Sequence, residues 1–275
     1  MFDFKKLCGV SAICLFTMLV GGCQAMHNNT SIQEIKKDEM VTVNLYGTKN
    51  TRDLGGYKIS GDKTTKSKMF FRSDNTDRLT DEDIRKLKEE CNLKNVIDLR
   101  YDSEIEAAPD KLSNIEEITY YNIPLYIPKE QMKDLINGKI DLGDAYIESL
   151  NQKEMVKNIF DTIANIDNDG SLLFHCTNGK DRTGTIAALL LGLCGVSNED
   201  IVNNYSVTYE LIKDNESVKK GIEKYGTDVI FKSLPEYMTK LMNHISEKYG
   251  NVENYLIECG ISKNNIDKIK DKFTV

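Results

Sequence analysis

The sequence is poor in features that define several classes of protein. It has four prolines and eighteen glycines in 275 residues, which excludes collagen-like and low-complexity chains. Its 36 Lys and Arg are outnumbered by 43 Asp and Glu, so it lacks the positive charge with which proteins bind nucleic acid broadly. No apolar run reaches the ~20 residues of a membrane span. A globular enzyme or binding domain remains, and any anion that it binds must be held by a few local groups.

Histidine is also scarce, and the cysteines do not form a pattern. The three histidines are His27, His175 and His244, and they show no metal-ligand spacing with cysteines or carboxylates, so we expect neither a metal nor a cofactor. A chain of this length needs no disulfide staples, so we expect free thiols in the body of the protein. The cysteines after the first 23 residues are Cys91, Cys176, Cys194 and Cys259.

Residues 1–22 have the layout of an export signal. Two lysines precede an apolar run at residues 7–20, which is too short to span a membrane. Two glycines then stand before Cys23, and this segment resembles a bacterial lipoprotein signal, which is cleaved before a lipid-modified cysteine. We therefore expect the protein to be exported and anchored by lipid at Cys23 to the outer face of a bacterial cell membrane. Ordinary secretion and an uncleaved anchor are the alternatives.

The rest of the chain divides into a tether, residues 23–40, and one domain, residues 41–275. The polar tether lacks periodicity and is expected to be flexible. Helical patterns separate the later strands, and this alternation predicts an α/β domain with a largely parallel sheet. The apolar run at residues 186–193 predicts a buried helix, followed by a helical C-terminal extension. Strands are predicted at Val41–Leu45, Lys68–Arg72, Asn95–Arg100, Ile118–Ile123 and Ser171–His175.

The strand at Ser171–His175 runs into a loop that opens directly into the apolar helix. Five residues separate Cys176 from Arg182. This spacing lets the backbone N–H groups of the loop converge at the positive N-terminal end of the helix, which predicts a cradle for a phosphate dianion. The predicted phosphate-binding residues are Thr177, Asn178, Gly179, Lys180, Asp181 and Arg182.

The side chains of this loop suit nucleophilic attack on phosphorus. Cys176 at its base is the predicted nucleophile, and Arg182 is expected to bind two phosphoryl oxygens. Thr183 can donate its hydroxyl to the sulfur, and Lys180 is expected to add a second cation over the pocket. His175 is interpreted as a buried imidazole that orders the loop. The alternative, a plain buried cysteine, does not explain the accompanying residues.

The loop resembles that of the atypical bacterial tyrosine-protein phosphatases, which reads His-Cys-x-x-Gly-Lys-Asp-Arg-Thr-Gly. That family includes members that also act on phosphoserine, phosphothreonine and phosphoinositides. Asn50-Thr-Arg-Asp-Leu-Gly-Gly56, Phe71-Arg-Ser-Asp74 and Val96-Ile-Asp-Leu-Arg100 are similar to three further elements of the family. We therefore expect a three-layer α/β cysteine-phosphatase fold with a helical C-terminal extension.

Several charged residues are expected to support the loop. Asp98 and Arg100 lie on one face at the carboxyl end of a predicted parallel strand, where ligands of such sheets bind. Arg52, Asp53 and Arg72 are expected to converge there as well. The alternative for a pair such as Asp98 and Arg100 is a buried structural ion pair.

The general acid is harder to assign. Residues 124–129 contain no carboxylate, so Asp181 in the loop is the first candidate and Asp98 is the second. Asp181 alternatively only positions Arg182 or Lys180. Residues 124–151 form either a lid over the pocket or an ordinary pair of surface helices.

These features predict hydrolysis of phosphomonoesters through a phosphocysteine intermediate. Phosphotyrosine proteins outside the cytoplasm are the first-choice substrates. Phosphoinositides or inositol phosphates are the alternative, because Lys180 adds charge suited to a multiply phosphorylated headgroup. A non-catalytic phospho-binding lipoprotein is disfavoured because Cys176, Arg182 and Thr183 are all present, and sulfur transfer does not need this Arg-Thr pair.

Overall fold

The computed structural model describes residues 41–126, 132–167 and 169–275. The expected export signal and the whole of the expected tether, residues 23–40 with Cys23, lie outside these residues. Within these ranges no helix has both the length and the apolar character needed to cross a membrane. In chain order the elements are β1 (Arg52–Asp53), β2 (Phe70–Ser73), α1 (Asp81–Glu89), β3 (Leu93–Asp98), α2 (Asp102–Ala107), β4 (Thr119–Asn122), α3 (Met132–Ile136), α4 (Leu142–Ser149), α5 (Lys153–Asn165), β5 (Ser171–His175), α6 (Asp181–Leu193), α7 (Asn198–Ser206), α8 (Thr208–Ile212), α9 (Glu216–Tyr225), the 3-10 helix η3 (Val229–Phe231), α10 (Pro235–Tyr249), α11 (Val252–Glu258) and α12 (Lys263–Phe273).

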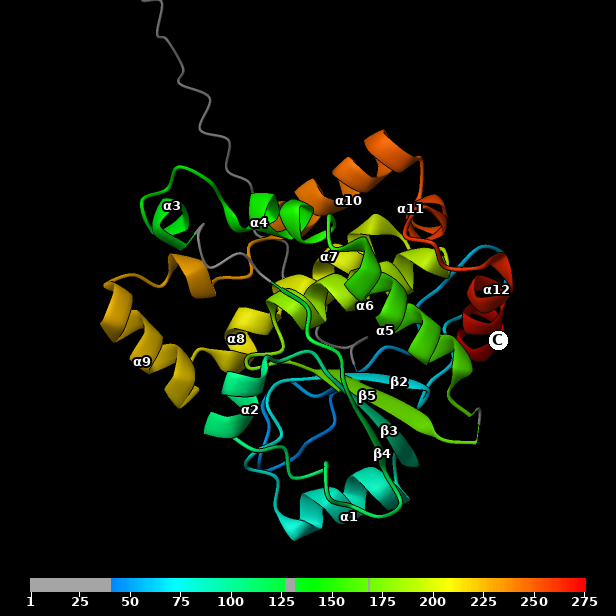
Figure 1. Ribbon diagram of the computed structural model, residues 1–275, viewed down its shortest axis with the longest axis horizontal. Helices are drawn as coiled ribbons and strands as arrows, with labels where there is room; N and C mark the ends of the chain where they lie inside the picture. Colours follow the sequence, from blue (N-terminus) through cyan, green and yellow to red (C-terminus); the bar gives the residue numbers. More distant parts are fainter. Residues whose placement is uncertain (1–40, 127–131, 168) are drawn as a thin grey trace, which may run out of the picture. The chain divides into compact units, whose positions relative to one another are not determined.

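The strands form one sheet in the order β1-β2-β5-β3-β4 (Figure 1). β5 lies in the middle and runs parallel to β2 on one side and to β3 on the other, and β4 extends the parallel part. The two-residue edge strand β1 runs antiparallel to β2. The predicted α/β fold with a largely parallel sheet is confirmed. Because the carboxyl ends of parallel strands meet at one edge, the loops that follow β2, β3 and β5 lie together there.

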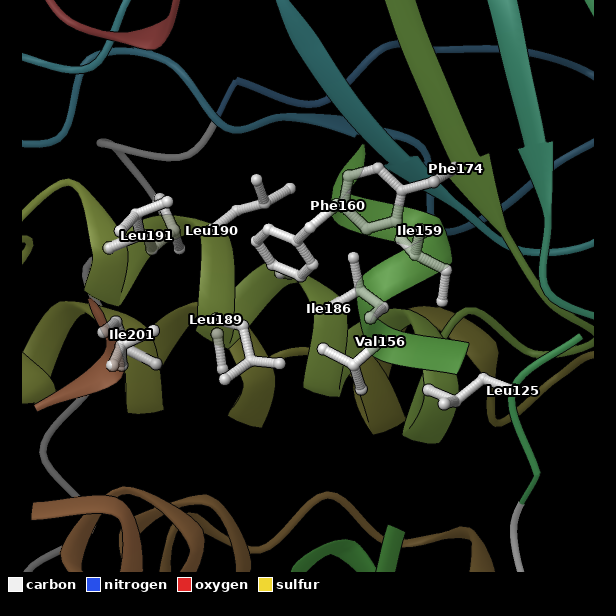
Figure 2. Close-up of a cluster of buried hydrophobic side chains, with 14 of the residues drawn as sticks. Leu125, Val156, Ile159, Phe160, Phe174, Ile186, Leu189, Leu190, Leu191 and Ile201 are labelled. Carbon is white, nitrogen blue, oxygen red and sulfur yellow. The ribbon is translucent and has the colours of Figure 1, made fainter. Parts of the chain in front are cut away.

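Alternating side chains along the strands assign the helices to two faces of the sheet. Phe174 of β5 belongs to the larger buried core, whereas its neighbour Leu173 belongs to a smaller one. The larger core includes Phe160 of α5 and Ile186 of α6, and Figure 2 shows these side chains close to Phe174. Leu87 of α1 belongs to the smaller core on the opposite face. The expected three layers are therefore present, with α1 on one side of the sheet and α5 and α6 on the other (Figure 1).

Helix α6 lies at the centre of the larger core. Residues 186–191 are each at most 2% exposed, as expected for a sequence that is apolar on all sides. Helices α7 and α11 contact α6, and α10 packs against α7. After β5 the described chain contains helices and no further strand, so the predicted helical C-terminal extension is confirmed.

The segment interpreted as a lid or as surface helices is partly built into this core. Helix α4 packs against α10, and its Ala145 and Tyr146 are 0% exposed. Helix α4 is therefore neither a separate lid nor an ordinary surface helix, because its buried face belongs to the same core as α6. Residues 127–131 of the segment lie outside the described residues.

The prediction of a strand at Val41–Leu45 is wrong. Only Thr42 pairs there, in a single bridge to Arg52, because the edge strand that it meets is two residues long. The prediction about thiols is correct, since all four cysteines in the described ranges are free and buried. Burial raises the pKa of Cys91 to about 11 and that of Cys194 to about 12.

Candidate active site

The loop from β5 to α6 forms a tight curl at the carboxyl edge of the sheet. Cys176 follows directly on the strand and is 3% exposed, and α6 begins at Asp181. The positive end of this thirteen-residue helix therefore adjoins the loop. Gly179 has a φ of +62°, and a Cβ there would lie 2.5 Å from the carbonyl oxygen of Ser73. The curl consequently requires glycine at this position.

The backbone amides of the loop are open to an anion. Among the described residues, no acceptor pairs with the N–H groups of Thr177, Asn178, Gly179 or Lys180. The carbonyl oxygens are used differently, because the Asn50 side-chain amide donates to those of Asn178 and Gly179 at 3.0 Å each. A row of unpaired amides before a helix N-terminus is suited to bind phosphate.

Two buried arginines connect this backbone to the sheet and to α7. Arg72 donates to the Gly179 carbonyl at 2.7 Å, and Arg52 donates to the side-chain oxygen of Asn50 at 2.6 Å. Both guanidinium groups also bind Asn204, one at its side-chain oxygen and the other at its carbonyl. Burial lowers the pKa of Arg72 to about 10, so this group remains charged at neutral pH. The structure thus brings Arg52 and Arg72 to the loop, as expected.

Asp53 is not brought to the loop, and the expectation that it joins the site is wrong. It follows Arg52 on β1, so its side chain lies on the opposite face of the strand. There its carboxylate accepts the N–H groups of Gly55 at 2.9 Å and Lys68 at 2.7 Å. Asp53 therefore fixes the turn after β1.

Arg182 is held by a carboxylate that the sequence did not reveal. Its Nη1 and Nη2 atoms lie 2.6 and 2.7 Å from the two oxygens of Glu104, and the Thr177 hydroxyl donates to Glu104 at 2.5 Å. Although burial opposes it, the hydrogen bonds and the charge of Arg182 lower the pKa of Glu104 to about 2. The guanidinium Cζ also lies 5.4 Å from the centre of the Tyr101 ring. Arg182 is therefore oriented before a substrate arrives.

A local signal for Glu104 exists in the sequence. Tyr101 and Glu104 are three residues apart at the start of α2, and the Glu104 carboxylate accepts the Tyr101 N–H at 3.0 Å. A glutamate three residues after the N-cap is typical of helix starts. That signal predicts a helix start, whereas the contact with Arg182 depends on the fold.

Lys180 does not place a second cation over the pocket, contrary to our prediction. Its side chain is 1% exposed, and its ammonium donates to the carbonyl oxygens of Ile230 at 2.7 Å and Lys232 at 3.2 Å. It also lies 3.1 Å from Asp181. The reason is that Ile230 in η3 and Lys232 directly after it present backbone carbonyls within reach of the ammonium, and such carbonyls need a donor. The backbone N–H of Lys180 still belongs to the cradle, while its side chain ties the loop to η3.

His175 and Asp98 belong to a buried ion-pair network behind the loop. His175 Nε2 lies 2.8 Å from a carboxylate oxygen of Asp110, and its Nδ1 lies 3.3 Å from the Cys176 carbonyl oxygen. Arg100 binds the Asp98 carboxylate through Nε at 3.0 Å and Nη2 at 2.7 Å. Although burial opposes it, the charges of Asp98 and Asp110 raise the pKa of His175.

This network bears on the second candidate for the general acid. Asp98 is 0% exposed and bound to Arg100, which favours the structural ion pair over the role of second candidate for the general acid. The ligand atoms of Asp98, Asp110 and His175 lie within 4.8 Å of one another. Arg100 already supplies the positive charge there, so a divalent metal would have to displace an existing ion pair.

Thr183 lies in the first turn of α6, and its hydroxyl is buried without a hydrogen-bond partner among the described residues. A buried polar group left unpaired costs roughly 1–3 kcal/mol. This hydroxyl is therefore available to a bound ligand or to the Cys176 sulfur.

Comparison with known proteins identifies the family. The model of the tyrosine phosphatase family matches residues 43–275. The chain belongs to this family. A tyrosine-protein phosphatase of Nostoc commune is 32% identical over 218 residues, which cover 73% of this chain and 72% of that protein. A Cupriavidus necator protein whose name also places it among the tyrosine-protein phosphatases is 26% identical over 221 residues, 75% of this chain and 80% of its own length.

Solved structures give a weaker likeness. The crystal structure of P. aeruginosa TpbA is similar with a TM-score of 0.34 and 14% identity, covering 67% of this chain and 96% of that one. The family match by itself shows that the chain is a phosphatase.

Proposed function

We propose that this phosphatase hydrolyses phosphotyrosine in proteins through a phosphocysteine intermediate on Cys176, without a metal. The observation that carries the proposal is the row of unpaired amides from Thr177 to Lys180 between Cys176 and Arg182. A phosphoryl group bound there would be surrounded by fixed donors, which stabilise the charge that develops in the transition state.

In the first step, the Cys176 thiolate attacks phosphorus, so that an S–P bond forms and the P–O bond to the leaving phenol breaks. Arg72, Lys180 and Arg182 all interact electrostatically with the Cys176 sulfur. Arg182 keeps its Nε–H for a phosphoryl oxygen, because its hydrogen bonds to Glu104 use Nη1 and Nη2. Asp181 supplies the proton that the leaving oxygen takes.

In the second step, water attacks phosphorus and the S–P bond breaks. Asp181, which is ionised after the first step, accepts the proton of the water. Thr183 donates its unpaired hydroxyl to the sulfur and makes the thiolate a better leaving group. Free phosphate is then released, the Cys176 thiolate is regenerated, and Asp181 again carries its proton.

The alternative substrate class, phosphoinositides, is no longer supported by the position of Lys180. That alternative needed the Lys180 ammonium over the pocket, whereas the ammonium binds the carbonyls of Ile230 and Lys232 and pairs with Asp181. Phosphotyrosine needs no cation beyond Arg182 and the loop amides, so it remains the proposed substrate.

The decisive experiment replaces the nucleophile. Wild-type protein should hydrolyse a phosphotyrosine peptide in the presence of EDTA, and it should hydrolyse a soluble phosphoinositide far more slowly. Cys176→Ser should lose turnover but still bind inorganic phosphate, because the amides and Arg182 remain. Retained turnover in Cys176→Ser, or loss of wild-type activity in EDTA that a divalent metal restores, would show that the mechanism is wrong.

We also propose that the enzyme is exported and held on the outer face of the membrane by lipid on Cys23. The support is the sequence of residues 1–23, with its charged start, apolar run and glycines before the cysteine. Cys23→Ala should either release active enzyme into the medium or leave the precursor unprocessed. Normal processing of this variant together with unchanged membrane fractionation would contradict the lipid anchor.

A further inference from the structure

A buried tyrosine from α4 contacts the loop aspartate. Tyr146 is 0% exposed, and its hydroxyl donates to Oδ1 of Asp181 at 2.5 Å. The same hydroxyl shares a hydrogen bond of 2.7 Å with the hydroxyl of Tyr205 on α7. The ammonium of Lys180 lies 3.1 Å from the same Asp181 oxygen. Oδ1 is thus bound by groups from two sides, although α4 lies far from the loop in sequence.

The second oxygen of Asp181 is in a different environment. Among the described residues, Oδ2 has no hydrogen-bond partner, and the Asp181 side chain is 27% exposed. The carboxylate is therefore anchored by one oxygen and open at the other. An aspartate without such an anchor would rotate about its side-chain bonds and present either oxygen in several directions.

Burying the Tyr146 hydroxyl in this part of the core costs free energy, which indicates that the hydroxyl has a role. The ring alone would pack equally well as phenylalanine, whereas a buried hydroxyl must find partners to offset its loss of water. Its partners are Tyr205 and Asp181, and of the two only Asp181 lies where the loop joins α6. Arg72 on β2 interacts electrostatically with both tyrosines.

We propose that Tyr146 is the positioning residue that fixes Asp181 for proton transfer. The proposal rests on the function given above, in which Asp181 gives a proton to the leaving oxygen and later takes one from water. Both transfers occur at Oδ2, while Tyr146 keeps its own proton and holds Oδ1. Proton transfer requires the donor within hydrogen-bond reach of the reacting oxygen, so loss of the anchor lowers the fraction of time that Oδ2 is in place.

The test compares two leaving groups in Tyr146→Phe, which removes the hydroxyl and keeps the ring. Expulsion of phenol from phenyl phosphate needs the proton, whereas p-nitrophenol is a far more acidic leaving group and needs it less. We expect kcat/KM to fall about tenfold or more for phenyl phosphate and less than about threefold for p-nitrophenyl phosphate. The ratio of the two values does not depend on how much of the variant is folded.

Two further variants complete the experiment. Asp181→Asn should show the same selective loss, and adding Tyr146→Phe to it should cost nothing more, because both act through one proton transfer. Tyr205→Phe is the matched control, since its hydroxyl contacts Tyr146 and not Asp181, and its substrate ratio should stay near that of wild type. Equal losses for both substrates in Tyr146→Phe, or additive losses in the double variant, would overturn the proposal. Failure of the phosphocysteine mechanism would appear separately, as turnover by Cys176→Ser.

Discussion

The two flanks of the phosphate loop are held by different kinds of interaction. On the flank toward α2, Arg182 pairs with Glu104, and these side chains are 11% and 28% exposed. On the flank toward β1 and β2, the carbonyl of Gly179 accepts hydrogen bonds from Asn50 and Arg72, which are fully buried. The buried flank fixes the shape of the backbone, while the exposed flank holds the charged group that we propose binds the phosphoryl group.

This difference indicates a division of labour within one short loop. Hydrogen bonds closed off from water keep their geometry, because breaking one leaves a buried polar group unpaired. An ion pair that is partly open to solvent can reorganise at lower cost when a phosphate brings its own charge. We therefore expect changes in the buried flank to abolish the site, and changes in the exposed flank to weaken it by degrees.

The largest effect should come from Gly179→Ala in the buried flank. The new Cβ would lie 2.5 Å from the Ser73 carbonyl oxygen, and the residue would also keep a φ of +62°. We expect phosphatase activity to become undetectable and the melting temperature to fall. Gly226→Ala is the matched control, because Gly226 has a φ of +69° but nothing within 4 Å of its Cβ position. Similar activity losses in both variants would mean that backbone strain, and not the contact with Ser73, is decisive.

A smaller effect should follow from Arg182→Lys in the exposed flank. A lysine keeps the charge but cannot pair with Glu104 in two places while binding a phosphoryl oxygen. We expect kcat/KM for a phosphotyrosine peptide to fall about 10²- to 10³-fold, as is typical for loss of a group that stabilises transition-state charge. Arg78→Lys, at an exposed ion pair with Glu216, serves as the control and should be nearly neutral. A rate near that of wild type in Arg182→Lys would assign the phosphate contact to the amides alone.

The smallest effect should be the acid sensitivity of the Glu104 ion pair. Its pKa of about 2 in the folded protein lies below the ordinary value of about 4.3, so the carboxylate stabilises the fold above the ordinary value. That contribution is lost as the pH falls through about 2. Glu104→Gln should therefore lower the free energy of unfolding by about 1–2 kcal/mol at pH 6, and the difference from wild type should shrink between pH 4 and pH 2. Denaturant titrations across this range measure it, and a difference that does not depend on pH would refute the assigned pKa.

The predictions from sequence were most accurate where the relevant residues are neighbours in the chain. The strand Ser171–His175, the loop after it and the buried helix α6 were predicted because an apolar run, a cysteine and an arginine follow one another within a short segment. The strand predicted at Val41–Leu45 failed because a β-branched run makes a strand only where a partner strand of sufficient length lies beside it.

The supports of the loop were harder to predict because they come from distant segments. Asn50 lies 128 positions from Asn178, to which it donates, and Glu104 lies 78 positions from Arg182. No periodicity or spacing connects residues so far apart, and only the packing of strands and helices brings them together. The sequence also did not predict the role of Asp53, which is next to Arg52. Because side chains alternate along β1, Asp53 lies on the face away from the loop that Arg52 supports.

The sequence by itself was enough to predict the chemistry that we propose for this protein, because the spacing from Cys176 to Arg182 and the helix after it set the shape of the loop locally. The tertiary structure decided how each side chain of that cradle is used. Lys180 is the clearest case, since a lysine in such a loop is free to reach a substrate until η3, fifty positions away, offers it buried carbonyls. Its direction was set by the cost of leaving those carbonyls unpaired, which arises only once the chain has folded.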